Sequence, residues 1–257
     1  MELNIKHLTL SSSSTDELIR IPQSVLKVNK DNNIVQESKQ RHVSKIIDSL
    51  ETKEGKGFMI HRPFLSHSIS DFDPFLLLDE TGPMDLKPKE ANGAPDHPHR
   101  GFETVTYAIP GKIEHKDSQN HSGKLSPGDV RWMTTGSRVI HSEMPTKEFV
   151  DKSGRLHGFQ LWVNLSKNDK MTKYSYQDIP SLNIPIIKIT DEKGVVRVIA
   201  GQAFDSNSII KTRIPILYLH MILDPDSKKV LRQFQKSIML LHTLSQVKVF
   251  GKDEKIC

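Results

Sequence analysis

Short apolar stretches alternate with turn residues along much of the chain, most regularly between residues 58 and 165. Turn signals such as Pro110-Gly111 and Pro127-Gly128 return at intervals of about 8–12 residues, the spacing of short strands in a sandwich or barrel. The stretches between them, for example Thr104–Ile109, are rich in β-branched and aromatic residues, which favour strands. We therefore predict an all-β fold for this part of the chain.

Three segments before residue 95 have patterns of their own. Apolar residues recur at helical spacing between Arg41 and Leu50, which predicts a short amphipathic helix there. Phe58–Arg62 and Asp73–Asp79 are predicted strands, since both are largely apolar and bounded by polar residues or proline. The prolines and glycines of residues 81–95 predict a loop, and loops beside a site commonly shape access to it.

A second apolar region follows a polar segment at residues 167–185, which we interpret as a linker. Four stretches in this region have the composition of strands, the last two forming a hairpin: Val195–Gly201, Ile214–Met221, Ser237–Leu244 and Gln246–Phe250. His220 and His242 each stand alone among apolar neighbours. We interpret both as buried, hydrogen-bonded histidines rather than as metal ligands.

Residues 1–40 are polar, poorly patterned and include a run of four serines at residues 11–14. This composition predicts a disordered tail. The alternative is a targeting segment, but the apolar core of a secretory signal is absent, and the acidic residues Glu2, Asp16 and Glu17 argue against a transit peptide.

Composition narrows the class of protein. The 257 residues include no apolar run of 18 or more, so no membrane span is expected. A single cysteine, Cys257, excludes an internal disulfide framework and favours a reducing compartment. The net charge of +5 is mild, and no dense basic stripe is interleaved with aromatic residues, so direct binding to nucleic acid is not expected.

Candidate chemistry is concentrated in two short motifs. His97 and His99 are two residues apart, as are His141 and Glu143. Side chains at this spacing share one face of a strand, whereas a helix would direct them about 200° apart. If both strands belong to one barrel, three imidazoles and a carboxylate can converge on one point.

This ligand set suits a first-row transition metal. Imidazole binds iron, copper, nickel and zinc, and a carboxylate makes the site harder. Closed structural zinc sites usually have four ligands and often cysteines, whereas non-haem iron enzymes use nitrogen and oxygen ligands and keep positions open. The remaining histidines of the first apolar region, His61, His67, His115 and His121, are interpreted as isolated or solvated residues.

The same motifs resemble the signature of the pirin family, within the cupins. The resemblance is carried by these segments: Asp71–Glu80, His97–Tyr107, Pro127–Thr134, Ile140–Pro145 and His157–Leu165. It implies a bicupin, with a metal-binding domain at residues 41–178 and a second, metal-free domain at 183–257. Because the family continues for several more strands, the second barrel is expected to be incomplete. Family members begin with extended segments, which makes a strand the alternative to the helix predicted at 41–50.

By this resemblance, one Fe(2+) is expected to be bound by four residues: His97, His99, His141 and Glu143. A general cupin consensus places its carboxylate ligand five residues after the second histidine, which is Thr104 here. Glu103 is one residue early, so a regular strand turns it to the opposite face. We therefore assign Glu143 as the carboxylate ligand and Glu103 as a supporting or structural residue.

The resemblance implies two classes of function. The first is a quercetin 2,3-dioxygenase that acts on a flavonol, with Glu143 as the catalytic base. Residues Phe102, Trp132 and Met133, together with the loop at 81–95, are expected to form apolar pocket walls. Gln160 is assigned either to the site or to a hydrogen bond across the sheet.

The second class is a non-enzymatic protein of the nucleus or cytoplasm. Pirins are associated with transcription-factor complexes and, in plants, with a G-protein α subunit, so the iron would act as a redox-sensitive switch for a partner. A third reading is a degenerate paralogue that has lost its function with its last strands. The four intact ligand positions argue against this reading.

Overall fold

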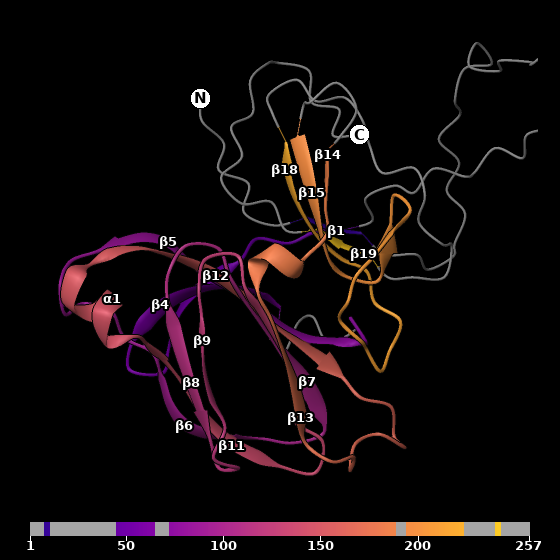
Figure 1. The fold of residues 1–257 in the computed structure, drawn as a ribbon, viewed down its shortest axis with the longest axis horizontal. Helices are drawn as coiled ribbons and strands as arrows, with labels where there is room; N and C mark the ends of the chain where they lie inside the picture. Colours follow the sequence, from indigo (N-terminus) through magenta and orange to yellow (C-terminus); the bar gives the residue numbers. More distant parts are fainter. Residues whose placement is uncertain (1–7, 11–44, 65–71, 189–193, 224–239, 243–257) are drawn as a thin grey trace, which may run out of the picture. The chain divides into compact units, whose positions relative to one another are not determined.

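The computed structural model describes residues 8–10, 45–64, 72–188, 194–223 and 240–242 (Figure 1). These residues are mostly strands, so the predicted all-β class is confirmed. The chain divides into two compact units, one formed by Ser49–Lys229 and the other by Met1–Asp48 together with Val230–Cys257.

The larger unit contains a seven-stranded antiparallel sheet of order β13-β10-β7-β12-β5-β4-β3. Its strands are β3 (Leu50–Glu54), β4 (Phe58–Phe64), β5 (Phe75–Leu86), β7 (Phe102–Ala108), β10 (Val130–Thr134), β12 (Gly154–Asn164) and β13 (Ser175–Ile179). The β-branched and aromatic residues that predicted a strand near Thr104 form β7, where six of the seven residues are buried.

A second, four-stranded sheet has the order β6-β11-β8-β9. Its strands are β6 (Ala94–His99), β8 (Ile113–Asp117), β9 (Ser122–Leu125) and β11 (Val139–Pro145). This sheet packs face to face on the larger one, because the Thr106 hydroxyl reaches Glu143 and the His99 ring contacts Trp162. Between β6 and β7 the chain passes from one sheet to the other through Gly101, whose φ of +80° favours glycine.

The pairing register decides which side chains face the smaller sheet. Thr104 pairs with both Met133 and Trp162, and Trp162 contacts His99, so all three lie on the inner face. Trp132 pairs with Val105, one residue along, and therefore lies on the outer face. The expectation that Trp132 lines the pocket is wrong, whereas Met133 has the predicted orientation.

A three-stranded sheet lies beyond the outer face of the seven-stranded sheet. It has the order β14-β15-β18, with strands β14 (Ile186–Lys188), β15 (Gly194–Ala200) and β18 (Tyr218–Leu223). The 3₁₀ turn η2 (Ser181–Asn183) precedes β14, and a short hairpin of β16 (Gln202–Ala203) and β17 (Ser206–Asn207) lies between β15 and β18 in the chain. The Tyr107 hydroxyl lies 2.7 Å from His220 Nδ1, and the Arg197 guanidinium lies 5.9 Å from the Tyr107 ring centroid. His220 is therefore hydrogen-bonded, as predicted.

The smaller unit is described only at three short strands. They are β1 (Leu8–Leu10), β2 (Lys45–Ile46) and β19 (Leu240–His242), in the antiparallel order β19-β1-β2. β1 falls within the predicted polar tail, and the rest of residues 1–40 lies outside the described residues. The predicted strand at Gln246–Phe250 and His67 also lie outside them. The domain boundaries proposed from the sequence stay predictions.

Two segments differ from the patterns seen in the sequence. The helix predicted at 41–50 is wrong where the structure describes it, since Lys45–Ile46 and Leu50–Glu54 are strands and the extended alternative holds. Leu50 is 63% exposed at the edge of its sheet, so its apolar spacing does not reflect burial. Backbone pairing with neighbouring strands has overridden a weak helical pattern.

The predicted loop at 81–95 is shorter than expected. β5 continues to Leu86 and β6 begins at Ala94. The strand passes Gly82 and Pro83 where its register with β12 shifts, because a bulge tolerates residues that a regular ladder excludes. The helix α1 (Lys147–Lys152) was not predicted; the Thr146 hydroxyl caps it, and Phe149 anchors it in the interior. No helix within the described ranges is long and apolar enough to cross a membrane.

Candidate metal centre

Three of the four predicted ligands meet on the inner face of the four-stranded sheet. His97 and His99 lie on β6, and His141 lies directly opposite His97 on β11. The ring centroids are 4.4 Å apart for His97 and His141, 4.7 Å for His97 and His99, and 4.8 Å for His99 and His141. Each ring offers a nitrogen within 4.8 Å of those of the other two. The i, i+2 spacing of the two histidines therefore places them on one face, as predicted.

The ring nitrogens of this cluster are arranged for a further partner. His97 Nδ1 lies 2.7 Å from the Pro95 carbonyl oxygen, and donation there leaves Nε2 with its lone pair. The Nε2 atoms of His99 and His141 are buried and have no hydrogen-bond partner among the described residues. A buried nitrogen without a partner is costly. The orphaned nitrogens and the donor set therefore fit a metal ion bound between the rings.

Glu143 lies beside this cluster and is held by two uncharged donors. The Thr106 hydroxyl donates to Oε1 at 2.6 Å, and the Gln160 amide donates to Oε2 at 3.1 Å. Its carboxylate forms a second potential metal-binding group with His141 and His115, again within 4.8 Å. The four predicted residues thus fall into two overlapping groups that share His141. Gln160 meets both predicted alternatives, since its amide donates to Glu143 and its Oε1 accepts the Thr106 hydroxyl across the sheet at 2.7 Å.

His115 was wrongly interpreted as a solvated turn residue. It lies on β8 opposite Glu143, is 2% exposed, and its Nδ1 is 3.3 Å from His141 Nδ1. Its neighbours Glu114 and Lys116 made the segment look exposed, but they point to the other face of the strand. The available signal was the i, i+2 pair of His115 and Asp117, the same spacing that identified the other histidines.

The environment favours the protonation states that bind metal. Burial, together with the neighbouring His141 and His97, lowers the pKa of His99 to about 3. Burial is also the main cause that lowers the pKa of His141 to about 4. Burial opposes the charge of Glu143, but His141, the Thr106 hydrogen bond and other charges outweigh it and lower its pKa. Near neutral pH, His99 and His141 thus offer neutral imidazoles and Glu143 an ionised carboxylate.

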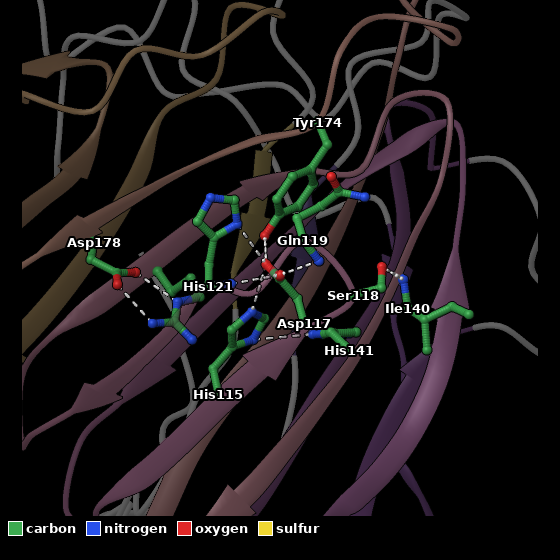
Figure 2. Close-up of polar contacts among 10 residues, drawn as sticks. His115, Asp117, Ser118, Gln119, His121, Ile140, His141, Tyr174 and Asp178 are labelled. Carbon is green, nitrogen blue, oxygen red and sulfur yellow. Dashed lines mark hydrogen bonds and ion pairs between the residues drawn. The ribbon is translucent and has the colours of Figure 1, made fainter.

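A chain of polar contacts leads from His141 toward the surface (Figure 2). His115 Nε2 lies 3.5 Å from Asp117 Oδ2, and the same carboxylate accepts the Tyr174 hydroxyl. Asp117 also accepts backbone N–H groups from Gln119 and His121. Burial would raise the pKa of Asp117, but these donors outweigh it and lower the pKa to about 2. The carboxylate is thus a fixed negative charge behind His115.

Aromatic side chains line the histidine cluster on the side of the larger sheet. The Phe102 and Trp162 rings lie 5.1 and 5.0 Å from the His99 ring and 4.6 Å from each other. Phe102 therefore lies where the sequence predicted a pocket wall, whereas Trp162 was missed. Glu103 has 0% exposure and accepts the Thr134 hydroxyl at 2.7 Å, consistent with a structural role on the opposite face.

Comparison with known proteins agrees with this geometry. The Pirin family model matches residues 57–163, which include both histidine motifs. Pirin from Homo sapiens is 42% identical over 181 residues, which cover 70% of this chain and 58% of human pirin. Residues 57–163 of this chain form a Pirin family domain.

Other pirin relatives and a solved structure show the same partial coverage. Pirin-like protein 2 from Arabidopsis thaliana is 42% identical over 187 residues, which cover 72% of this chain and 54% of the plant protein. A crystal structure of quercetin 2,3-dioxygenase from Acinetobacter baumannii has a TM-score of 0.62 at 38% identity, covering 66% of this chain and 60% of the bacterial one. This chain thus has the cupin fold and spans little more than half the length of these relatives.

Proposed function

We propose that this pirin-like cupin protein binds one Fe(2+) through His97, His99, His141 and Glu143 and acts as a quercetin 2,3-dioxygenase on a flavonol. The proposal depends on one observation, the convergence of three histidine rings whose buried Nε2 atoms at positions 99 and 141 lack a partner. The similarity to a protein named quercetin 2,3-dioxygenase supports the choice of reaction.

The donor set supports iron as the metal. The two groups contain imidazole nitrogens and one carboxylate, and nitrogen and oxygen ligands of this kind occur in non-haem iron oxygenases. Bound iron would supply the redox chemistry with dioxygen that no side chain of the protein provides. The lowered pKa values of His99, His141 and Glu143 favour their deprotonated forms, so metal binding to these three residues would displace few protons.

Residues around the cluster would bind and orient the flavonol. The rings of Phe102 and Trp162 offer apolar surfaces beside His99, against which a flat aromatic substrate can pack. Glu143, ionised and held at both oxygens, would accept the proton of the flavonol hydroxyl. Thr106 and Gln160 would keep that carboxylate beside the histidine cluster as it changes from metal ligand to base.

Metal analysis and oxygen uptake test the proposal together. The full chain is loaded anaerobically with Fe(2+), its metal content and spin-resonance spectrum are recorded, and dioxygen consumption is measured with quercetin. One iron per chain is expected, lost in His141→Ala and retained in His61→Gln, which alters a histidine outside both groups. Glu143→Gln is expected to abolish oxygen uptake. The proposal fails if iron binds equally to wild type and His141→Ala, or if quercetin causes no uptake by the iron-loaded chain.

The predicted protein partners, namely transcription-factor complexes or a G-protein α subunit, and the nuclear or cytoplasmic location stay predictions. The same iron-loaded protein separates the two classes of function. Turnover of a flavonol that Glu143→Gln abolishes favours the enzyme, whereas a partner interaction that depends on the iron but not on Glu143 favours the switch.

A further inference from the structure

A hollow opens at the seam where one edge of the larger sheet meets the smaller sheet. It has a volume of about 500 Å³ and is lined by residues from the β8–β9 turn, the β10–β11 loop and the start of β13: Gln119, His121, Ser137, Arg138, Lys173, Tyr174, Ser175 and Tyr176. None of these belongs to the two potential metal-binding groups. The hollow is therefore separate from the metal centre, although Tyr174 contacts the polar chain behind it.

The charge of the hollow is positive. Arg138 and Lys173 are both exposed, and neither forms an ion pair within the part of the chain that the structure describes. No carboxylate is among the lining residues. Asp117 lies behind the lining, where it accepts the Tyr174 hydroxyl and N–H groups of Gln119 and His121, and Asp178 forms a two-pronged ion pair with Arg131 at 2.6 and 2.7 Å. An anion placed between Arg138 and Lys173 would thus meet no competing negative charge on the lining.

Aromatic rings form the other part of the lining. The His121 ring centroid lies 5.8 Å from that of Tyr174 and 5.2 Å from that of Tyr176. The Tyr174 hydroxyl is committed to Asp117, which fixes this ring in place, and Figure 2 shows Tyr174 and His121 above that carboxylate. Fixed rings beside two unpaired cations suit a ligand that combines a flat apolar part with a negative group.

We propose that this hollow binds a small aromatic anion, namely a ring that carries a phosphate, sulfate or carboxylate group. Arg138 and Lys173 bind the oxyanion, the hydroxyls of Ser137 and Ser175 offer further donors, and the ring packs against Tyr174 and Tyr176. This proposal does not depend on the metal centre or on the proposed reaction.

Calorimetric titration of the full chain with phenyl phosphate tests it. A chelator removes metal first, so that phosphate binding to a metal ion does not contribute, and low ionic strength limits screening of the exposed cations. Saturable binding at one site is expected. Lys173→Ala and Arg138→Ala are each expected to raise the Kd about tenfold, since each removes a charge-assisted contact. Lys124→Ala alters an exposed cation on β9 that does not line the hollow, and is expected to leave the Kd unchanged.

Two further probes separate the parts of the ligand. Phenol carries the ring without the charge and inorganic phosphate carries the charge without the ring, so both are expected to bind at least tenfold more weakly than phenyl phosphate. Because the substituted side chains are exposed, circular dichroism is expected to show unchanged folding. The proposal is overturned if phenyl phosphate does not saturate, if Lys173→Ala and Arg138→Ala bind it like wild type, or if inorganic phosphate binds equally well.

Discussion

Replacing Thr106 by valine tests the hydroxyl that holds Glu143 and that also lies 2.7 Å from Gln160 Oε1. The substitution keeps the branched shape and the buried position on β7 but removes the hydroxyl that donates to Glu143 Oε1 at 2.6 Å. A hydrogen bond to a buried charged group contributes about 1.5–3 kcal/mol, and this one is in the short range typical of O–H to carboxylate. We therefore expect the free energy of unfolding of the metal-free protein to fall by about that amount.

The same substitution is expected to weaken the metal centre. Loss of a group that orients a metal ligand typically costs about 10- to 100-fold in metal affinity. Urea unfolding of the chelated protein measures the first effect, and competition with a metal-binding dye measures the second. Thr106→Ser keeps the hydroxyl and should restore most of both quantities.

Thr134→Val is the matched control. Its hydroxyl donates to a buried glutamate, Glu103, at 2.7 Å, on the opposite face of the same sheet. This variant should lower stability but leave metal affinity unchanged, because Glu103 lies away from the histidine cluster. If Thr106→Val and Thr134→Val alter metal affinity equally, or if Thr106→Val alters neither stability nor affinity, the assigned role of Thr106 is refuted.

Three further predictions concern stability. Burial, helped by Arg197, lowers the pKa of His220 to about 4, so this histidine stabilises the fold fully above the unfolded pKa of about 6.5 and progressively less as pH falls toward 4. Between pH 7.5 and 5, wild type should lose about 1–2 kcal/mol more than His220→Phe in urea unfolding, and parallel losses would contradict this. Thr146→Ala removes the cap of α1 and should cost about 1 kcal/mol, with Thr146→Ser close to wild type. Gly136→Ala should lower the Tm markedly, because φ is +50° and a Cβ would lie 2.0 Å from the Thr172 carbonyl oxygen; an unchanged Tm would show that the loop relaxes freely.

The sequence predicted those features that depend on local alternation. The paired spacing of His97 with His99 and of His141 with Glu143 needs only the geometry of a strand. The structure brings the three histidines together and places Glu143 in a second group that shares His141. Turn residues likewise predicted the short strands of the first sandwich.

Features that depend on register could not be predicted in the same way. Trp132 and Trp162 are both aromatic residues on central strands, and only the pairing of Val105 with Trp132 and of Thr104 with Trp162 shows that the second faces the histidines. His115 was missed for a related reason. Its polar neighbours Glu114 and Lys116 made β8 look exposed, whereas the inner face of this strand is buried against the seven-stranded sheet.

Strand β7 places Thr106 and Tyr107 on its two opposite faces. Thr106 holds the Glu143 carboxylate on the inner side, and Tyr107 contacts His220 and Arg197 of the three-stranded sheet on the outer side. Strand β7 pairs with β10 on one edge and with β12 on the other, so the backbone at these two residues is held on both sides. Displacement of one of the two side chains is therefore expected to move the backbone that carries the other. A displacement of β18 is thus expected to reach the Glu143 carboxylate through two adjacent residues of β7.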